Sequence, residues 1–494
     1  MTTIPSAPAT SALTREELAP LPGSDDAPPR TPDPLDFPGY AAKLETLDDA
    51  ESVGTGLIEL AGEQAVVAIG DFSYLGGSMG QVHGDRVAAA MAVALERRLP
   101  FLAVISSGGA RMQEGMVSLM QMARATEGVR RLRAAGLPVL AHFTHPTTGG
   151  VHASYGAAAD IVIADEGATV GFAGPRVAEA FSGEPIGDDS HTAETAHEAG
   201  LVDQLTPEGQ ARAQLTAWIE LVHPARRDGP LPAAAHVPEP TVAHDAWDAV
   251  QAARHDDRPS GRDLLAEVFD AHLELHGDRA GADDGAAISA VARLGERRVV
   301  VLGFDRRGGG DGSHGSSGRP TAAGFRKLRR GAELAARWGM PLVTLIDTSG
   351  ADPSPESDLD GLAVAISETF IATLDVPAPT IAVVTGEGGS GGALAIGACD
   401  RLLMQDDAVF EVIAPEGAAS ILHRDAGRAE EVAPRLRPTA SDLRELGVCD
   451  RIVPGPITFD PATAARALRD EFAATLADLD ADPDRLDARR RRYG

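Results

Sequence analysis

Short apolar runs alternate along this chain with longer stretches in which apolar residues recur every three or four positions. The short runs predict buried strands, and the periodic stretches predict helices that connect them. The first series has runs at 66–71, 100–105 and 138–142 and a helical stretch at 83–97. About 240 residues later the series recurs, with runs at 299–304, 341–346 and 380–385 and a helical stretch at 321–338. This alternation is typical of parallel sheets, so we predict an α/β protein that carries one fold twice.

A glycine-rich turn stands at the same place in each copy, where the last of these strands runs into a helix. The first turn contains Gly149 and Gly150, and the second contains Gly391 and Gly392. Paired glycines at a helix start leave backbone N–H groups exposed, and such groups can stabilise a developing oxyanion. The two turns therefore predict a protein that polarises two carbonyl groups.

Proline-rich polar stretches divide the chain. Residues 1–40 are predicted to be a disordered leader, and residues 223–258 are predicted to be a linker between domains. The first domain then covers residues 41–222 and the second covers residues 259–494.

Composition excludes several classes of protein. The formal net charge of −29 argues against a nucleic-acid surface, which needs a basic footprint. Cys399 and Cys449 are the only cysteines, so neither a disulfide framework nor a four-cysteine zinc site is expected. The chain has no run of apolar residues long enough to span a membrane and no basic-then-apolar start, so we expect a cytoplasmic location.

Several uncommon strings make the chain resemble the carboxyltransferase component of acetyl-CoA carboxylase, with a β-type and an α-type subunit fused in that order. The β-type strings occupy residues 76–80, 107–114, 118–123 and 171–177. The α-type strings occupy residues 277–279, 282–284, 386–397 and 415–422. The resemblance implies two tandem crotonase-like domains, each a ββα superhelix.

The resemblance also implies a reaction and a site. The family transfers a carboxyl group from carboxybiotin to acetyl-CoA or a related short acyl-CoA, which gives malonyl-CoA for fatty-acid or polyketide synthesis. Gly149 and Gly150 would hold the thioester enolate, and Gly391 and Gly392 would hold the biotin carbonyl. The remaining implied residues are Gly108, Gly109, Ala110 and Arg111 for acyl-CoA, and Gly388, Gly389 and Ala393 for biotin.

Partners follow from what the sequence lacks. It contains no Ala-Met-Lys-Met biotinylation string and no recognisable ATP-binding carboxylase domain. Separate biotin carboxylase and biotin carboxyl carrier proteins are therefore expected to supply the carboxybiotin. The family's assembly implies a homodimer or a larger homo-oligomer, and no bound metal is expected.

The chain departs from the family pattern in three places. The β-type zinc ribbon is missing, residues 349–362 differ from the α-type string, and His152 replaces a small residue. These differences leave the acyl substrate open. They also leave two other functions open, which are the carboxyltransferase of a biotin-dependent decarboxylase system and a non-catalytic scaffold that binds acyl-CoA or the carrier.

Several single motifs also allow less specific interpretations. The glycines at 386–392 resemble a dinucleotide fingerprint, but they come late in their domain. Glu114 and Glu387 resemble hydratase-type acids, but they are better interpreted as charges at helix starts. His142, His145 and His152 suggest a metal, but without a suitably spaced acidic or cysteine partner they are better interpreted as packing or pocket-lining residues. The helical stripe of Met112, Met116 and Met120 is predicted to be core, and Arg489–Arg492 is predicted to be a solvated tail.

Overall fold

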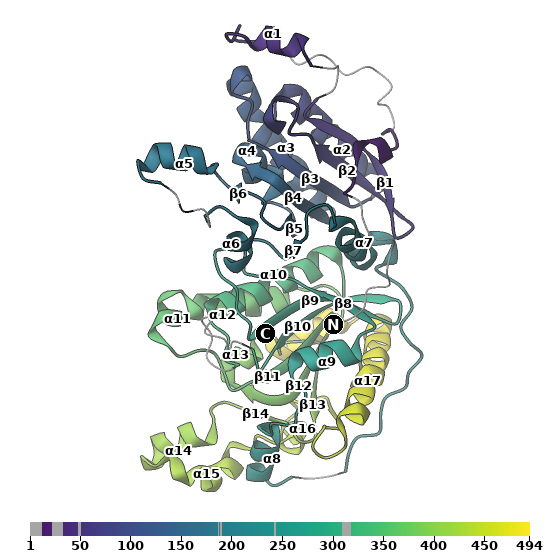
Figure 1. Ribbon diagram of the computed structural model, residues 1–494. Helices are drawn as coiled ribbons and strands as arrows, with labels where there is room; N and C mark the ends of the chain where they lie inside the picture. Colours follow the sequence, from purple (N-terminus) through teal and green to yellow (C-terminus); the bar gives the residue numbers. More distant parts are fainter. Residues whose placement is uncertain are drawn as a thin grey trace. The chain divides into compact units, whose positions relative to one another are not determined.

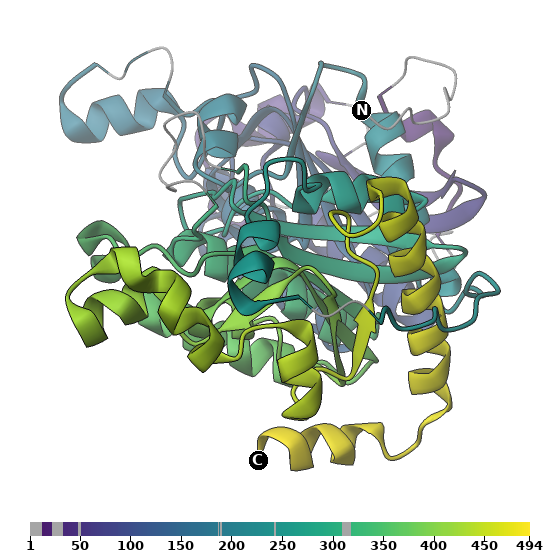
Figure 2. The same ribbon diagram turned by 90° about the horizontal axis from the view of Figure 1, so that it is seen from below.

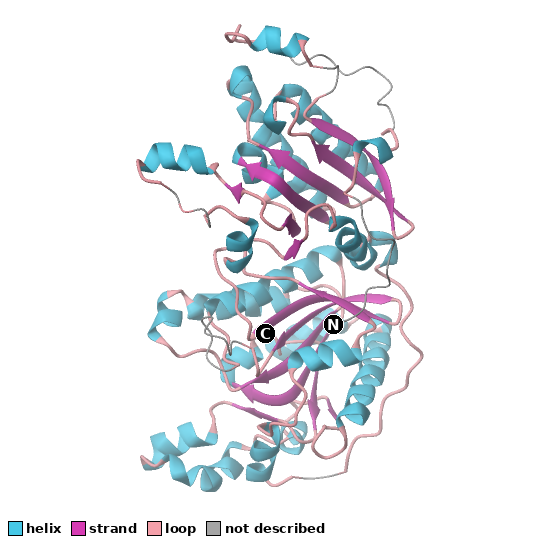
Figure 3. Cartoon of the chain, viewed as in Figure 1, coloured by secondary structure: helices cyan, strands magenta, loops and turns pink. Residues whose placement is uncertain are grey.

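The computed structural model describes residues 12–21, 33–47, 51–185, 187, 190–241, 244–308 and 318–494. Their contacts divide the chain into two compact units (Figure 1). Unit 1 contains residues 3–225 and 279–281, and unit 2 contains residues 226–278 and 282–494. Each unit combines one sheet with several helices (Figure 3).

The sheet of unit 1 is parallel except for the antiparallel pair β1–β2. Its order is β1-β2-β3-β4-β5-β7, and β6 pairs with β4. The strands are β1 Val53–Leu60, β2 Glu63–Gly70, β3 Phe101–Ser107, β4 Val139–Thr148, β5 Ile161–Asp165, β6 Val170–Gly171 and β7 Gln204–Thr206. The helices are α1 Tyr40–Glu45, α2 Gln81–Arg97, α3 Met116–Ala134, α4 Gly149–Val151, α5 Pro175–Ser182, α6 Ala193–Glu198 and α7 Ala211–Val222.

Unit 2 repeats this topology with one more antiparallel strand at the edge. Its order is β15-β13-β12-β11-β10-β9-β8, and β14 pairs with β12. The strands are β8 Ala271–Glu274, β9 Ala287–Leu294, β10 Arg297–Phe304, β11 Leu342–Thr348, β12 Thr380–Gly389, β13 Arg401–Gln405, β14 Val409–Glu411 and β15 Arg451–Val453.

The helices of unit 2 connect and cover these strands, and the last of them, near the C-terminus, is drawn in yellow in Figure 2. They are α8 Ala246–Ala253, α9 Gly261–Val268, α10 Ala322–Trp338, α11 Pro355–Leu359, α12 Leu362–Leu374, α13 Ser390–Leu394, α14 Pro415–His423, α15 Ala429–Leu436, α16 Ala440–Glu445, α17 Pro461–Ala481 and α18 Arg485–Tyr493. Among the described residues, no helix has both the length and the apolar character needed to cross a bilayer.

The strand registers show the predicted duplication residue by residue. In unit 1, Ser107 of β3 pairs with Thr147 of β4, and in unit 2, Thr348 of β11 pairs with Gly388 of β12. Both counterparts lie 241 positions later in the sequence (107 to 348, 147 to 388). At the next strand the offset falls to 240, from residue 161 to residue 401. The extra residue of unit 1 is absorbed by a π-helical turn at His152–Gly156, directly after α4.

Part of the predicted disordered leader is ordered. Residues 12–21 pack on β1, where Ala19 forms a bridge with Leu57, and Leu13 and Leu21 are buried. A Cβ atom on Gly56 would lie 2.6 Å from Leu18 Cβ, so a glycine on the strand makes room for this segment. Residues 1–11 and 22–32 of the predicted leader lie outside the described residues.

The second half of the predicted linker is also structured. Helix α8 buries Ala249, Val250 and Ala253 against Val409 of unit 2. Arg258, five residues after α8, has no exposed side-chain surface. Sequence composition did not indicate this packing, because the preceding proline-rich stretch dominates the region.

Candidate active site

Two turns of unit 1 pack backbone against backbone at the carboxyl ends of β3 and β4. A Cβ atom on Gly109 would lie 3.0 Å from Gly149 Cα, and one on Gly149 would lie 2.7 Å from Gly109 Cα. Their φ angles are +115° and +66°, which disfavour residues with side chains. Gly108 adds a third contact of this kind, because its N–H donates to Gly76 O at 2.9 Å.

Hydrogen bonds decide which N–H groups of these turns remain for a ligand. Gly149 donates its N–H to Phe172 O at 2.9 Å, and Gly109 donates to a hydroxyl of β3 at 3.0 Å. The N–H groups of Ala110 and Gly150 have no acceptor within the described part of the chain. A Cβ atom on Gly150 would lie 3.5 Å from Ala110 Cβ, so these two residues are neighbours. The Gly149 N–H, which we expected to face the ligand, is instead used within the protein.

Unit 2 builds a matching pair of turns after β11 and at the start of α13. Gly350 has a φ of +124°, and its N–H donates to Thr348 Oγ1 at 3.2 Å. Ser390, at the start of α13, has a φ of +57°. The N–H groups of Ala351 and Gly391 have no acceptor among the described residues. The same two N–H groups therefore lack an acceptor among the described residues of each unit.

The 241-residue offset makes Gly391 the counterpart of Gly150, and Ser390 the counterpart of Gly149. Gly392 then corresponds to Val151 and lies one position beyond the counterpart turn. An alignment of Gly149 and Gly150 with Gly391 and Gly392, which the sequence suggests, is therefore wrong by one residue. The reason is that Ser390 adopts the left-handed conformation that a glycine adopts in unit 1. Apart from its chain neighbours and its own helix, no described residue comes within 4 Å of a Cβ atom built on Gly391.

The other residues implied for biotin occupy different surroundings. Gly388 and Gly389 form the end of β12, directly before the turn. Ala393 is fully buried inside α13, so its side chain faces the protein.

Arg111 contributes no exposed side chain to the site. Its guanidinium is fully buried, forms an ion pair with Glu51, and donates to Glu114 Oε1 at 3.0 Å and to Ser78 O at 2.7 Å. Burial lowers the pKa of Arg111, but the hydrogen bond and charge of Glu51 outweigh it and raise the pKa overall. Arg111 therefore supports the turn from behind, and Glu114 belongs to the same buried cluster.

Unit 2 places several carboxylates near the carboxyl end of β12, a cluster that sequence reasoning missed apart from Glu387. Glu387 pairs with Arg254 Nε at 2.6 Å, and Arg254 Nη1 pairs with Glu416 at 2.6 Å. Burial raises the pKa of Asp347 to about 6, although nearby arginines lower it. Burial and the charge of Glu387 raise the pKa of Glu411 to about 8. The only sequence signal for this cluster is a charged residue within the glycine run.

The histidines considered as metal ligands have separate partners. His142 Nε2 lies 2.8 Å from Asp165 Oδ1, and His145 Nδ1 accepts a hydrogen bond from Thr169 N at 3.2 Å. His152 packs edge-on against Phe143 with ring centroids 5.2 Å apart. In the described ranges, no group of three His, Cys, Asp or Glu side chains is suited to hold a metal ion.

The methionine stripe is exposed, which contradicts the prediction that it is core. Met112 and Met116 are each 66% exposed, and Met120 is 58% exposed. The counterpart helix of unit 2, α12, also exposes apolar residues, with Val364 at 62% and Ile371 at 57%.

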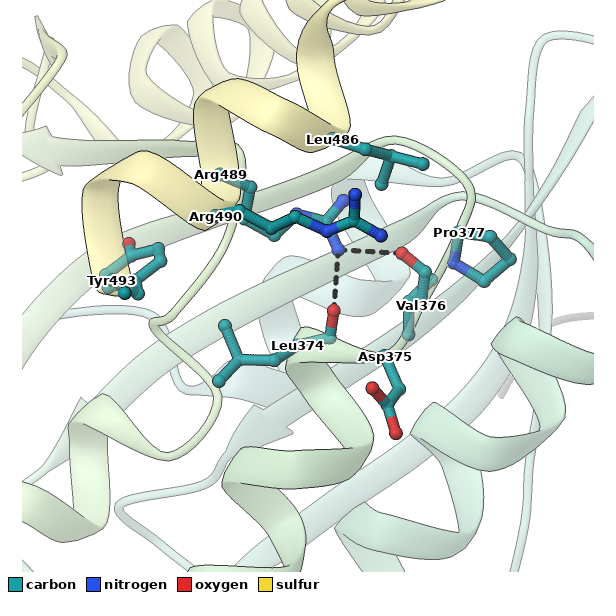
Figure 4. Close-up of a pocket in the computed structure, with 9 residues that line it drawn as sticks. Leu374, Asp375, Val376, Pro377, Leu486, Arg489, Arg490 and Tyr493 are labelled. Carbon is teal, nitrogen blue, oxygen red and sulfur yellow. Dashed lines mark hydrogen bonds between the residues drawn. The ribbon is translucent and has the colours of Figure 1, made fainter.

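The arginine-rich C-terminal segment is only partly solvated, contrary to prediction. Arg489 is buried and pairs with Asp400 at 2.7 Å, and Arg492 pairs with Asp450 at 2.6 Å. Figure 4 shows Arg489 donating to the carbonyls of Leu374 and Val376 beside a cavity of about 400 Å³. These bonds tie α18 to the loop before β12.

Comparison with known proteins gives consistent matches. A family model described as "acetyl co-enzyme A carboxylase carboxyltransferase-like" matches residues 240–494. A protein of Salinispora tropica named "acetyl-coenzyme A carboxylase carboxyl transferase subunits beta/alpha" is 43% identical over 90% of this chain and 81% of its own length. A protein of Mycobacterium bovis named "probable biotin-dependent acyl-coenzyme A carboxylase beta3 subunit" is 36% identical over 92% of this chain and 90% of its own.

Solved structures share the fold at lower identity. The transcarboxylase 12S structure, described as a hexamer, has a TM-score of 0.72 at 23% identity and covers 87% of this chain and 82% of its own. A single-chain, multi-domain long-chain acyl-CoA carboxylase has a TM-score of 0.67 at 17% identity, over 84% of this chain and 41% of its own. This similarity, together with the repeated sheet topology, confirms the two tandem crotonase-like α/β domains that the resemblance predicted.

Proposed function

This chain belongs to the acetyl-CoA carboxylase carboxyltransferase family, and we propose that it carboxylates acetyl-CoA or a related short acyl-CoA, with malonyl-CoA as the product for acetyl-CoA. Bound carboxybiotin, carried on a separate protein, supplies the carboxyl group. The observation that carries the proposal is the repeated pair of N–H groups, one pair in each unit, that have no acceptor in the described parts of the chain. A reaction between two carbonyl-containing partners needs two such devices.

In unit 1, the proposed role of Ala110 and Gly150 is to donate hydrogen bonds to the thioester oxygen as negative charge develops on it. Gly109 and Gly149 allow this close arrangement, because side chains there would collide with backbone. Loss of one such donor in other enzymes lowers kcat by roughly 10²–10³-fold.

In unit 2, the proposed role of Ala351 and Gly391 is to donate to the ureido carbonyl of biotin. The open space beside Gly391 fits the approach of a flat ligand carbonyl. Gly388 and Gly389 support this turn from the end of β12.

The direct test is a carboxylation assay with purified biotin carboxylase and carboxylated carrier protein. Acetyl-, propionyl- and butyryl-CoA are offered in parallel, because the altered 349–362 segment leaves the acyl preference open. Turnover with at least one of them is expected. Absence of turnover with all three would overturn the proposal.

Gly391→Ala tests the site in unit 2 with little disturbance of the fold. Among the described residues outside its own helix, nothing lies within 4 Å of the alanine methyl, so the melting temperature should stay unchanged. The methyl would occupy the space beside the donor N–H, so kcat should fall by about 10²-fold. Steady-state kinetics and thermal unfolding check this, and wild-type turnover in Gly391→Ala would contradict the assignment.

We also propose that a second copy of the chain covers the apolar faces of α3 and α12. The support is that counterpart helices of both units expose large apolar side chains.

A further inference from the structure

The end of β12 has almost no side chains with which to hold its position. Gly386, Gly388 and Gly389 are required there, because Cβ atoms would lie 2.2 Å from Asp347 Oδ1, 2.6 Å from the Phe410 ring and 2.3 Å from a backbone carbon, respectively. Glu387 is the single residue of this run with a side chain. Glycine also has the largest backbone entropy to lose, so a contact of the Glu387 side chain adds to the backbone pairing of this strand end with β14.

Unit 1 solves the same problem within its own strand. The counterparts of Gly388 and Gly389 are Thr147 and Thr148. Thr147 Oγ1 donates to Ile105 O at 2.8 Å, and Thr148 Oγ1 donates to Ser107 O at 3.3 Å. These hydroxyls fix β4 to β3, and unit 2 has no equivalent hydroxyls at these two positions.

Arg254, at the C-terminal end of α8, contacts the side chain that remains. Its Nε donates to Glu387 Oε1 at 2.6 Å. Its Nη1 and Nη2 donate to the two carboxylate oxygens of Glu416 at 2.6 and 3.2 Å. One guanidinium thus joins the end of β12 to the first turn of α14, with the bidentate geometry that makes such pairs strong.

Helix α8, which ends directly before Arg254, is held in place by packing and hydrogen bonds. Figure 1 shows α8 beside α14 and α15, and its buried alanines pack with Val409. Arg306 donates to the carbonyls of Ala253, Arg254 and His255 at 3.2, 2.9 and 3.2 Å, which fixes the helix end. Four residues after Arg254, Arg258 Nε donates to Thr385 O at 3.0 Å, on β12 itself.

We propose that Arg254 is a positioning residue, which holds Glu387 and thereby keeps the Gly391 N–H group aligned for its ligand. The proposal rests on the proposed function, because it assigns Arg254 a part in the same reaction. Arg254 acts through β12 and need not touch the substrate.

Arg254→Met is the decisive variant, and Arg451→Met is its matched control. Arg451 is 27% exposed, against 29% for Arg254, and it also pairs through Nε and Nη1 with two glutamates, Glu471 at 2.7 Å and Glu239 at 3.5 Å. It stands at the first residue of β15, the edge strand of the sheet, which pairs with β13 and not with β12. Arg451→Met should lower the melting temperature at least as much as Arg254→Met, because it leaves the fully buried Glu471 without its arginine, whereas Glu387 and Glu416 are partly exposed.

Kinetics with carboxylated carrier should separate the two variants. Arg254→Met is expected to lower kcat by about 10- to 100-fold, because small displacements of catalytic groups have effects of this size. The KM for acyl-CoA should change less than about twofold, because unit 1 is proposed to bind acyl-CoA. Arg451→Met should leave kcat within about twofold of wild type.

Arg254→Lys should recover only part of the loss in kcat, because a lysine ammonium cannot bridge two carboxylates as a guanidinium does. Arg254→Met with turnover equal to that of Arg451→Met would overturn the proposal.

Amide hydrogen exchange gives a readout that does not depend on activity. Residues 384–394 should exchange faster in Arg254→Met than in wild type, and Arg451→Met should leave this segment unchanged. Unchanged exchange in Arg254→Met would overturn the positioning role even if the enzyme is active. Faster exchange in a protein without carboxyl transfer would support the role and overturn the proposed function.

Discussion

Glu411 is a buried carboxyl group whose Oε2 has no hydrogen-bond partner among the described residues. It is 6% exposed, and burial together with the charge of Glu387 raises its pKa to about 8. The folded protein therefore retains a proton that the unfolded chain releases at lower pH. The stability gained from the neutral form is complete below the ordinary glutamate pKa and is lost as pH rises towards 8.

Glu411→Gln should flatten this pH dependence, because the amide is neutral at every pH. Urea unfolding at pH 5, 7 and 9 measures the free energy of unfolding of both proteins. Wild type should lose on the order of a few kcal/mol more stability between pH 5 and 9 than Glu411→Gln. Equal slopes for the two proteins would show that Glu411 is ionised in the folded state.

Ser390 is strained at the residue level, because its φ of +57° is unfavourable for a side chain. Ser390→Gly should remove this strain and stabilise the fold by about 1 kcal/mol or less, since glycine also costs chain entropy. Ser390→Val should destabilise it, because a β-branched residue fits this region poorly. Denaturation midpoints of the two variants should shift in opposite directions, and a loss of stability with glycine would contradict the argument.

At the scale of elements, periodicity predicted what depends on local sequence. The helical stretches at 83–97 and 321–338 correspond to α2 and α10, and the apolar runs correspond to β2, β3, β4, β10, β11 and β12. The segment at 12–21 was missed, because its order comes from the fit of Leu18 to Gly56 on a strand distant in sequence.

The candidate site was also predictable only where it depends on local sequence. Glycine turns are local signals, and they led to Gly150 and Gly391. The commitment of the Gly149 N–H to Phe172 and the burial of Arg111 depend on tertiary contacts that spacing does not encode. Arg254 lies more than 100 residues before Glu387, so no local pattern connects them.

At the scale of the whole molecule, the exposed methionines of α3 predict how copies associate. A second copy on this face would bury Met116 and Met120, so Met116→Glu with Met120→Glu should weaken the assembly. Light scattering should give the mass of an oligomer for wild type and a smaller mass for the double variant. An unchanged mass would place the interface elsewhere.

The structured half of the presumed linker also has a consequence for evolution. Because α8 and Arg258 pack within unit 2, a genetic fission of this chain is tolerated only at some points between the two sheets. A cut after Arg258 would leave the second product without its support for β12, whereas a cut before Asp245 would keep helix and strand on one polypeptide. If such a protein were encoded by two genes, the gene for unit 2 would therefore begin well upstream of the first strand of that unit, β8.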